Sequence, residues 1–188
     1  MAQFVNPDLL LRLPARLLNG VRPVEMPAGY RVRGLREGDF DAWQRMHRRA
    51  VPSFSEKDLT EWWGFYQAVA LPNGIFFAED AEGRAIASAG CIHESRDGAY
   101  PFTGQLAWVV TDPDHQGRGI AAALCTRCVH RMIEIGYRSI LVQTGDDLLP
   151  AIRVYLRLGF EPMFYEPDMR GRWREIYRLN GMAWPGAD

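Results

Sequence analysis

The chain has 188 residues, of which 47% are hydrophobic and 24% are charged, and its formal net charge at pH 7 is −1. This length predicts a single domain with a full hydrophobic core. The balanced charge argues against a nucleic-acid-binding surface, which usually carries a basic excess, and no segment approaches the roughly 18 consecutive apolar residues of a membrane span.

Residues 1–28 are predicted to form an N-terminal arm, ahead of a main domain at 29–180 and a short C-terminal tail at 181–188. Four prolines limit any helix in the arm to about two turns. They are Pro7, Pro14, Pro23 and Pro27. The stretch Leu9–Leu13 has no basic region before it, as a signal peptide would have. We expect its leucines to pack on the domain or on a second subunit, which makes a homodimer a candidate assembly.

Alternating apolar and polar residues predict a half-buried strand at 30–35. A helix is predicted from Asp39, which can act as its N-cap, and a second helix from Ser55 to Ala70. The second helix carries aromatic side chains on more than one face. They are Trp62, Trp63, Phe65 and Tyr66. One face must be core, and the other is either an interface or the wall of a ligand pocket.

Two strands at 74–80 and 84–93 are predicted to form a hairpin around a turn that contains Gly83. A strand at 102–111 follows and becomes continuously apolar toward its end, as strands covered on both faces do. A helix over 117–135 comes next, with apolar residues at helical spacing.

The chain has three cysteines, and two of them, Cys125 and Cys128, lie in this last helix with C-x-x-C spacing. No second cysteine pair completes a tetrahedral zinc site, and three cysteines cannot form a closed disulfide framework. We therefore predict buried thiols, no metal, and a reducing cytoplasmic location.

A buried strand is predicted at 139–144, followed by a short helix over 150–158 with Gly159 as its stop. Strands at 160–164 and 173–179 are expected to finish the sheet as a hairpin. The order of elements predicts an α/β fold with one mixed sheet and helices on both of its faces.

A pattern that can bind an anion lies where the strand ending at Thr111 meets the next helix. A polar loop leads to Gly117 and Gly119, and a helix of small residues begins at once with Ala121 and Ala122. The first four N–H groups of a helix lack internal partners, and the positive end of the helix dipole lies there. Glycine lets a ligand approach the backbone closely, so this turn can hold a phosphate group.

Two other phosphate-binding folds fit this turn less well. A P-loop requires Gly-Lys-Ser/Thr after four spacer residues, and no such lysine is present. A Rossmann turn is closer, because residues 117–122 match its loose G-x-G-x-x-G/A pattern and Asp146 lies at a sequence distance suited to a ribose contact. Residues 112–116 nevertheless separate the strand from the first glycine, and too little chain remains for further βαβ units.

A second motif follows after an intervening strand. Gln116-x-x-Gly119-x-Ala121 is succeeded by Ala151-Ile152-x-x-Tyr155-x-x-x-Gly159-Phe160. This ordered pair resembles the GNAT-type N-acetyltransferase superfamily, over roughly residues 29–179. The resemblance implies a single domain with a central mixed, mostly antiparallel sheet of six to seven strands and helices on both faces. It also implies acetyl-CoA as cosubstrate, no metal, and direct acetyl transfer in a ternary complex to a primary amine of a small molecule or peptide.

The resemblance also implies roles for individual residues. The turn is expected to bind the diphosphate of acetyl-CoA, and a backbone N–H near Val110 to polarise the thioester carbonyl. Tyr155 stands where the family has a general acid that protonates the departing thiolate. The expected cofactor-binding residues are Val109, Val110, Thr111, Gln116, Gly117, Arg118, Gly119, Ile120, Ala121 and Ala122.

The pattern does not identify the base that deprotonates the amine. Candidates are Glu79, His93, Glu94, Glu166 and Asp168. Many family members carry Asn at the position of Leu148, and this departure permits an alternative function, a non-catalytic acyl-CoA-binding or sensor module. The predicted partner is an amine substrate, with neither nucleic acid nor a membrane.

Overall fold

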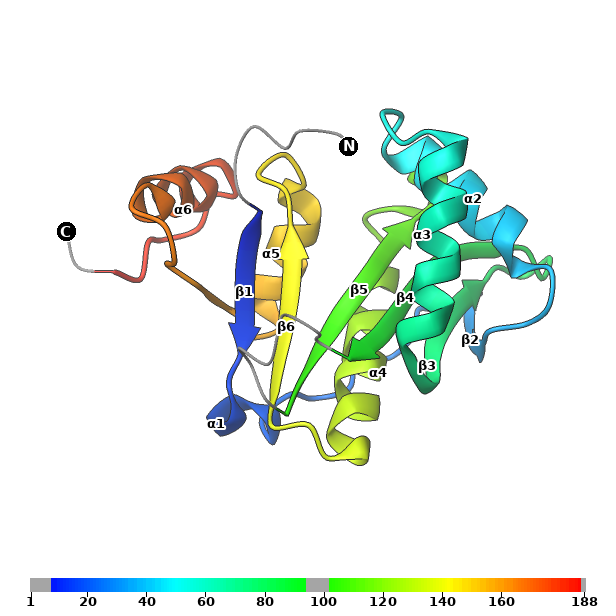
Figure 1. Cartoon of the computed structure of the whole chain (residues 1–188), viewed down its shortest axis with the longest axis horizontal. Coiled ribbons are helices and arrows are strands. Elements are labelled where there is room, and N and C mark those ends of the chain that lie inside the picture. Colours follow the sequence, from blue (N-terminus) through cyan, green and yellow to red (C-terminus); the bar gives the residue numbers. More distant parts are fainter. Residues whose placement is uncertain (1–7, 94–101, 187–188) are drawn as a thin grey trace.

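The computed structural model describes residues 8–93 and 102–186, which form one seven-stranded sheet with helices on both faces (Figure 1). The strand order is β2-β3-β4-β5-β6-β1-β7. The strands are β1 (Leu9–Leu13), β2 (Arg31–Gly34), β3 (Ala70–Glu79), β4 (Ala85–His93), β5 (Thr103–Thr111), β6 (Ser139–Thr144) and β7 (Glu161–Pro162). Only β5 and β6 run parallel among these neighbours. The predicted mixed, mostly antiparallel sheet is therefore confirmed.

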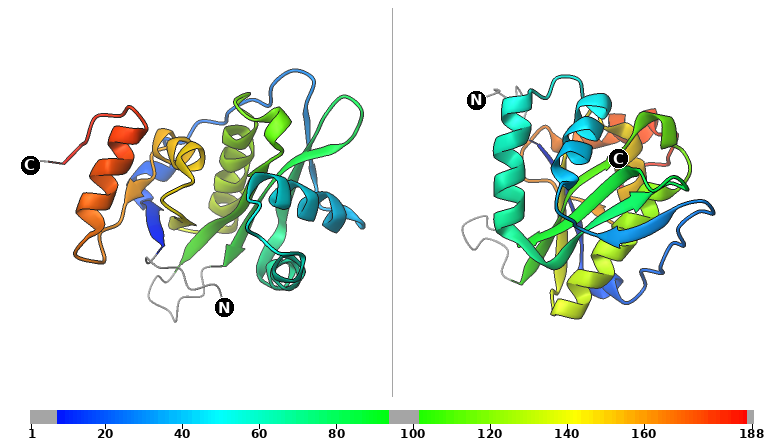
Figure 2. Two further views of the ribbon diagram at one scale, coloured as in Figure 1. Left: turned by 90° about the horizontal axis from the view of Figure 1, so that it is seen from above. Right: turned by 90° about the vertical axis from the view of Figure 1, so that its right-hand side faces the viewer.

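The helices pack on the two faces of this sheet (Figure 2). They are α1 (Ala15–Leu18), α2 (Asp39–Ala50), α3 (Glu56–Val69), α4 (Ile120–Ile135), α5 (Leu149–Arg157) and α6 (Met169–Leu179), with a 3₁₀ turn, η1, at Pro113–His115. One buried cluster lies under α2 and α3 and contains Trp43 and Tyr66, and another lies under α4 and α5. In the part of the chain that the structure describes, no helix combines the length and the apolar character needed to cross a membrane.

The N-terminal segment departs from the prediction. Residues 9–13 are not an arm on the surface but an interior strand, because β1 runs antiparallel to both β6 and β7. Leu9, Leu11 and Leu13 are fully buried. A strand that is covered on both faces has a continuous apolar sequence, which explains the run of leucines. The exact outer boundaries of the domain stay a prediction.

The end of the chain departs from the prediction as well. The expected strand at 173–179 is part of helix α6, and β7 has only two residues. Met169, Trp173 and Ile176 are buried and recur at spacings of three and four, which is the pattern of a helix that packs one face. The predicted hairpin is therefore wrong: β7 is the edge strand and pairs with β1, from the other end of the chain.

Candidate functional site

The strands β5 and β6 separate toward the C-terminal end of β5, and this separation positions the candidate site (Figure 1). Their parallel pairing ends at Leu106 and Val142. On its other edge β5 stays paired with β4 as far as Thr111. The backbone groups of β5 that point toward β6 beyond Leu106 thus have no strand partner in the described sheet. Val109 and Val110, two of the predicted cofactor contacts, lie in this stretch.

A β-bulge in β5 coincides with the separation. The register between β4 and β5 shifts after Ser88, and Trp108 adopts a φ of +54°, a left-handed conformation that is rare for a bulky side chain. Val109 packs toward the cluster under α4, whereas Val110 belongs to the cluster under α2 and α3. The bulge therefore bends β5 at the point where its edge toward β6 no longer has a strand partner.

The loop after β5 is held in place by side chains from two directions. The buried Asp112 accepts two hydrogen bonds from Arg49 Nη1 of α2, at 2.6 and 2.8 Å, and Arg49 Nη2 also reaches Asp114 at 2.9 Å. Gln116 Nε2 donates to Thr111 O at 3.1 Å and ties the end of the loop back to β5. These contacts give the loop a defined shape before any ligand binds.

The N-terminus of α4 carries free hydrogen-bond donors. Gly119 is the N-cap with a φ of +85°, and no side chain caps this end. The first backbone bond of the helix runs from Ala123 N to Gly119 O at 3.1 Å. Within the described chain, the N–H groups of residues 117–122 have no protein acceptor. With the dipole of a 16-residue helix behind them, these groups form an anion-binding site.

Tyr155 lies on α5, on the same side of the sheet as this helix terminus. It shares one buried cluster with Ile120, and its ring is 6.1 Å from that of Phe160. The side chain is 4% exposed. Burial raises the pKa of Tyr155 well above its usual value, with Cys125 and Cys128 adding to the effect. The hydroxyl therefore keeps its proton at neutral pH and can act as a donor.

The two helix cysteines lie in the core, as the sequence predicted. Cys125 and Cys128 are both buried and unpaired. Burial raises the pKa of the Cys125 thiol, so it stays protonated and unreactive. Both cysteines belong to the buried cluster that contains Tyr155, so they pack around that side chain.

An aromatic cluster occupies the opposite side of the sheet at the bulge. The ring of Trp108 lies 5.4 Å from both Trp43 and Trp62 and 6.0 Å from Tyr66. Phe65 points away and is 54% exposed. The aromatic residues of α3 thus serve mainly as core, and Trp62 and Trp108, both partly exposed, line the bulge on this side.

The structure rules out Glu79 as a free base. Its carboxylate is 2% exposed and accepts hydrogen bonds from Arg33, Arg31 at 2.7 Å and Arg36 at 3.1 Å. The Arg33 hydrogen bond is the main cause that lowers the pKa of Glu79. This side chain forms a structural ion-pair cluster at the edge between β2 and β3.

The remaining base candidates do not converge on the bulge. His93 Nδ1 is 2.9 Å from the hydroxyl of Tyr137, which follows the C-terminal end of α4. Asp168 is the N-cap residue of α6, and Glu166 is exposed in the loop before it. Glu94 lies outside the described residues. Asp146, which a Rossmann site would need for ribose, instead forms an ion pair with Arg172 at 2.5 Å.

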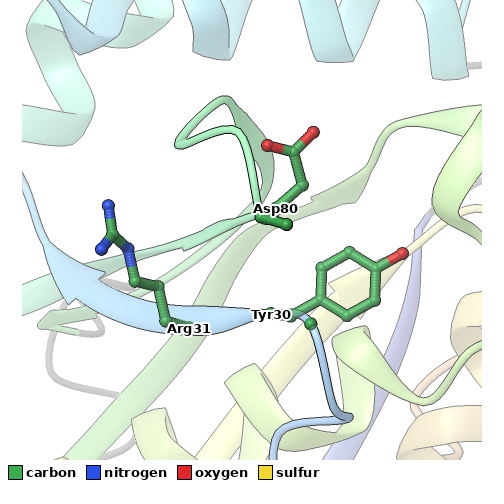
Figure 3. Close-up of a pocket in the computed structure, with 5 residues that line it drawn as sticks. Tyr30, Arg31 and Asp80 are labelled. Carbon is green, nitrogen blue, oxygen red and sulfur yellow. The ribbon is translucent and has the colours of Figure 1, made fainter.

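A pocket of about 220 Å³ lies at the edge of the sheet (Figure 3). It is lined by Gly29, Tyr30, Arg31, Asp80 and Ala81. Tyr30 connects this pocket to the glycine loop, because its hydroxyl lies 2.6 Å from Arg118 Nη1 and 3.0 Å from His115 Nδ1. No sequence motif pointed to Tyr30, since the contact joins residues 88 positions apart.

Comparison with protein families supports the resemblance seen in the sequence. The model of the "Acetyltransferase (GNAT) family" matches residues 39–160. This range includes β5, the glycine loop, α4 and Tyr155. The anion site and Tyr155 thus fall within the region that the family shares.

Curated relatives include mycothiol acetyltransferases from several bacteria. The protein of Geodermatophilus obscurus is 30% identical over 159 residues, which is 77% of this chain and 50% of the relative. The protein of Pseudarthrobacter chlorophenolicus is 28% identical over 147 residues, which is 72% of this chain and 43% of the relative. The chain therefore spans about half the length of these curated relatives.

Solved structures share the fold at low identity. A GCN5-related N-acetyltransferase from Sphaerobacter thermophilus matches with a TM-score of 0.62 and 19% identity, over 84% of this chain and 50% of that one. A phosphinothricin acetyltransferase from Sinorhizobium meliloti, in complex with AcCoA, matches with a TM-score of 0.60 and 22% identity, over 71% of this chain and 75% of that one. With the family model covering the sheet centre and both motifs, the chain belongs to the acetyltransferase (GNAT) family.

Proposed function

We propose that the chain is an acetyl-CoA-dependent N-acetyltransferase that acts on a primary amine of a small molecule or peptide. The observation that carries this proposal is the row of unpartnered N–H groups at residues 117–122, next to the free edge of β5. A diphosphate fits the first feature, and a pantetheine amide chain fits the second. Family membership supports acetyl-CoA as the ligand that combines both groups.

In the proposed reaction the amine attacks the thioester carbon directly in a ternary complex. A C–N bond forms, the carbonyl oxygen gains negative charge, and a backbone N–H near Val110 donates to it. The C–S bond then breaks, the departing CoA thiolate takes the proton of Tyr155, and the tyrosinate regains a proton from water to complete the turnover. The amine proton leaves through water or through a base that stays unassigned. Positioning of the two reactants supplies much of the rate.

The acceptor, location and assembly are part of the same proposal. Because curated relatives are named mycothiol acetyltransferases, a mycothiol-related amine belongs among the acceptors to be tested. We propose a metal-independent enzyme, since the reaction needs only the donor, the amine and a proton source. We also propose a cytoplasmic location, which the free cysteines Cys91, Cys125 and Cys128 support. A homodimer stays a prediction.

A thiol-release assay with acetyl-CoA and a panel of small amines and peptides tests this function. We expect amine-dependent release of free CoA and a mass increase of one acetyl group on the acceptor. The alternative function, a non-catalytic acyl-CoA-binding or sensor module, predicts thermal stabilisation by CoA without release for any amine. Stabilisation by NAD but not by CoA would contradict both functions.

Substitution of Gly119 tests the anion site itself. In Gly119→Ala the residue keeps a φ of +85° only under strain, and the new Cβ projects to the side where the nearest protein atom is Pro27 Cγ at 4.0 Å. We expect the KM for acetyl-CoA to rise about tenfold, because the diphosphate is held away from the amides, with a smaller change in kcat.

The matched control is Gly136→Ala at the other end of α4. Gly136 has a φ of +107° and also has open space around its missing Cβ. Both variants should lose similar stability in thermal unfolding, but only Gly119→Ala should alter the KM. Equal KM changes in the two variants would mean that strain in α4, and not ligand contact, is responsible.

A further inference from the structure

The segment that leads from α1 to β2 runs beside α4 toward its N-terminus. Val24 N donates to Thr126 Oγ1 on α4 at 3.2 Å. Pro27 then lies next to Gly119, with its Cγ 4.0 Å from the position of a Cβ there. Tyr30 follows at the start of β2, beside the pocket of Figure 3. The segment therefore ends at the glycine loop, although it lies outside residues 39–160 that match the family model.

Tyr30 joins two side chains of the loop through one hydroxyl. Arg118 Nη1 lies 2.6 Å from the Tyr30 oxygen, and His115 Nδ1 lies 3.0 Å from it. Because the guanidinium can only donate, the oxygen accepts from Arg118, and the hydroxyl proton is left to donate to His115. The rings of Tyr30 and His115 also meet edge to face, with centroids 5.7 Å apart.

Arg118 has a second contact, and we call the arrangement in which Tyr30 Oη and Asp114 O both hold its guanidinium the Arg118 clamp. Arg118 Nη2 donates to Asp114 O at 3.1 Å, within the same loop. The described chain contains no carboxylate paired with this guanidinium. The guanidinium is thus held against the loop that leads to the free amides of α4, and no described acidic side chain neutralises its charge.

We propose that Tyr30 is a positioning residue for the phosphate-rich end of acetyl-CoA, which it serves by holding Arg118 beside the loop. This inference rests on the proposed function, because it takes acetyl-CoA as the ligand of the loop. Without the Tyr30 hydroxyl, the long Arg118 side chain is free to sample other rotamers, and ordering it again opposes binding. Tyr30 thus extends the cofactor site to a segment that carries neither family motif.

The test compares two acetyl donors in the same variant. In Tyr30→Phe the KM for acetyl-CoA should rise about fivefold to tenfold with kcat unchanged, as expected when one long side chain must be ordered again on binding. With S-acetylpantetheine, which has the thioester but no diphosphate, the variant and the wild type should be equally active. A defect of equal size with both donors, or an unchanged KM for acetyl-CoA, would overturn the inference.

A matched control separates this role from a general effect of removing a hydroxyl. Tyr137 also bonds a histidine, with its hydroxyl 2.9 Å from His93 Nδ1, but it follows the opposite end of α4. Tyr137→Phe should leave the KM for acetyl-CoA unchanged. Arg118→Ala should raise the KM for acetyl-CoA. The double variant with Tyr30→Phe should show little further increase, because both substitutions abolish the same contact between Tyr30 and Arg118.

Calorimetric titration with CoA distinguishes failure of this inference from failure of the proposed function. If the wild type binds CoA but releases no thiol with any amine, the transferase proposal fails. The clamp can then still be tested by comparing the affinities of Tyr30→Phe and the wild type for CoA and for pantetheine, since only the affinity for CoA should fall in the variant. If Tyr30→Phe binds CoA as tightly as the wild type does, or if the wild type binds no CoA, the clamp is wrong.

Discussion

Tyr155→Phe is expected to lower kcat by about 100-fold while the affinity for acetyl-CoA changes little, the usual effect of removing a general acid. The substitution removes only a hydroxyl, and the ring can keep its contact with Phe160 at 6.1 Å. Because burial raises the pKa of Tyr155 well above 10.0, the wild-type side chain stays protonated across the neutral range. Deprotonation of Tyr155 should therefore not reduce turnover anywhere in the neutral range.

The choice of leaving group makes this measurement diagnostic. A thiolate whose conjugate acid has a lower pKa leaves without needing a proton. Acetyl thioesters of such thiols should therefore recover much of the lost rate in Tyr155→Phe. A defect of the same size with every donor would instead assign Tyr155 a packing role, and unchanged turnover would remove it from the mechanism.

Tyr177→Phe provides the matched control for this substitution. Tyr177 is also a buried tyrosine whose pKa is raised mainly by burial, but it lies on α6 against Trp184. Its loss should leave kcat unchanged with all donors. A similar fall in both variants would point to general loosening of the core.

Local patterns predicted most of the elements correctly. Alternation and helical spacing identified the hairpin β3–β4, the long strand β5 and the helices α2 to α5, because these elements bury one face or both in a regular way. The strand predicted at 173–179 was an error that the local pattern could have prevented. Trp173, Ile176 and Tyr177 recur at spacings of three and four, and with Met169 they form the buried stripe of α6.

Features that depend on distant pairing were not predictable. Leu11 pairs with Val142 across the whole domain, and no local signal at Leu9–Leu13 names that partner. The same holds for the site. The motifs indicated the glycine loop and Tyr155, but the contact between Tyr30 and Arg118 joins segments 88 residues apart. The left-handed Trp108 also follows from tertiary packing and not from its own preference.

Acid should destabilise this protein through His47. The side chain is 4% exposed among aromatic rings on α2, and its Nδ1 lies 2.9 Å from Trp43 O, to which the neutral ring can donate. Burial lowers the pKa of His47 from 6.5 to about 4. The unfolded chain binds a proton near pH 6.5, and the folded chain resists doing so until about pH 4.

The sign of the effect follows from this difference. The contribution of His47 to the free energy of unfolding is complete above pH 6.5 and is lost as the pH falls toward about 4. Since one pKa unit corresponds to about 1.4 kcal/mol, the loss over this window is about 3 kcal/mol. Urea unfolding at several pH values between about 7.5 and about 4 measures this loss as a fall in the free energy of unfolding.

His47→Asn isolates the contribution. The asparagine amide can still donate to Trp43 O but does not titrate in this range. We expect this variant to be less stable than the wild type at pH 7.5, because it fills less of the aromatic cluster, and to lose less stability on acidification. Ion-paired carboxylates such as Glu79 also weaken in acid, but they do so in both proteins. Parallel profiles of unfolding free energy against pH would therefore show that His47 does not carry the acid sensitivity.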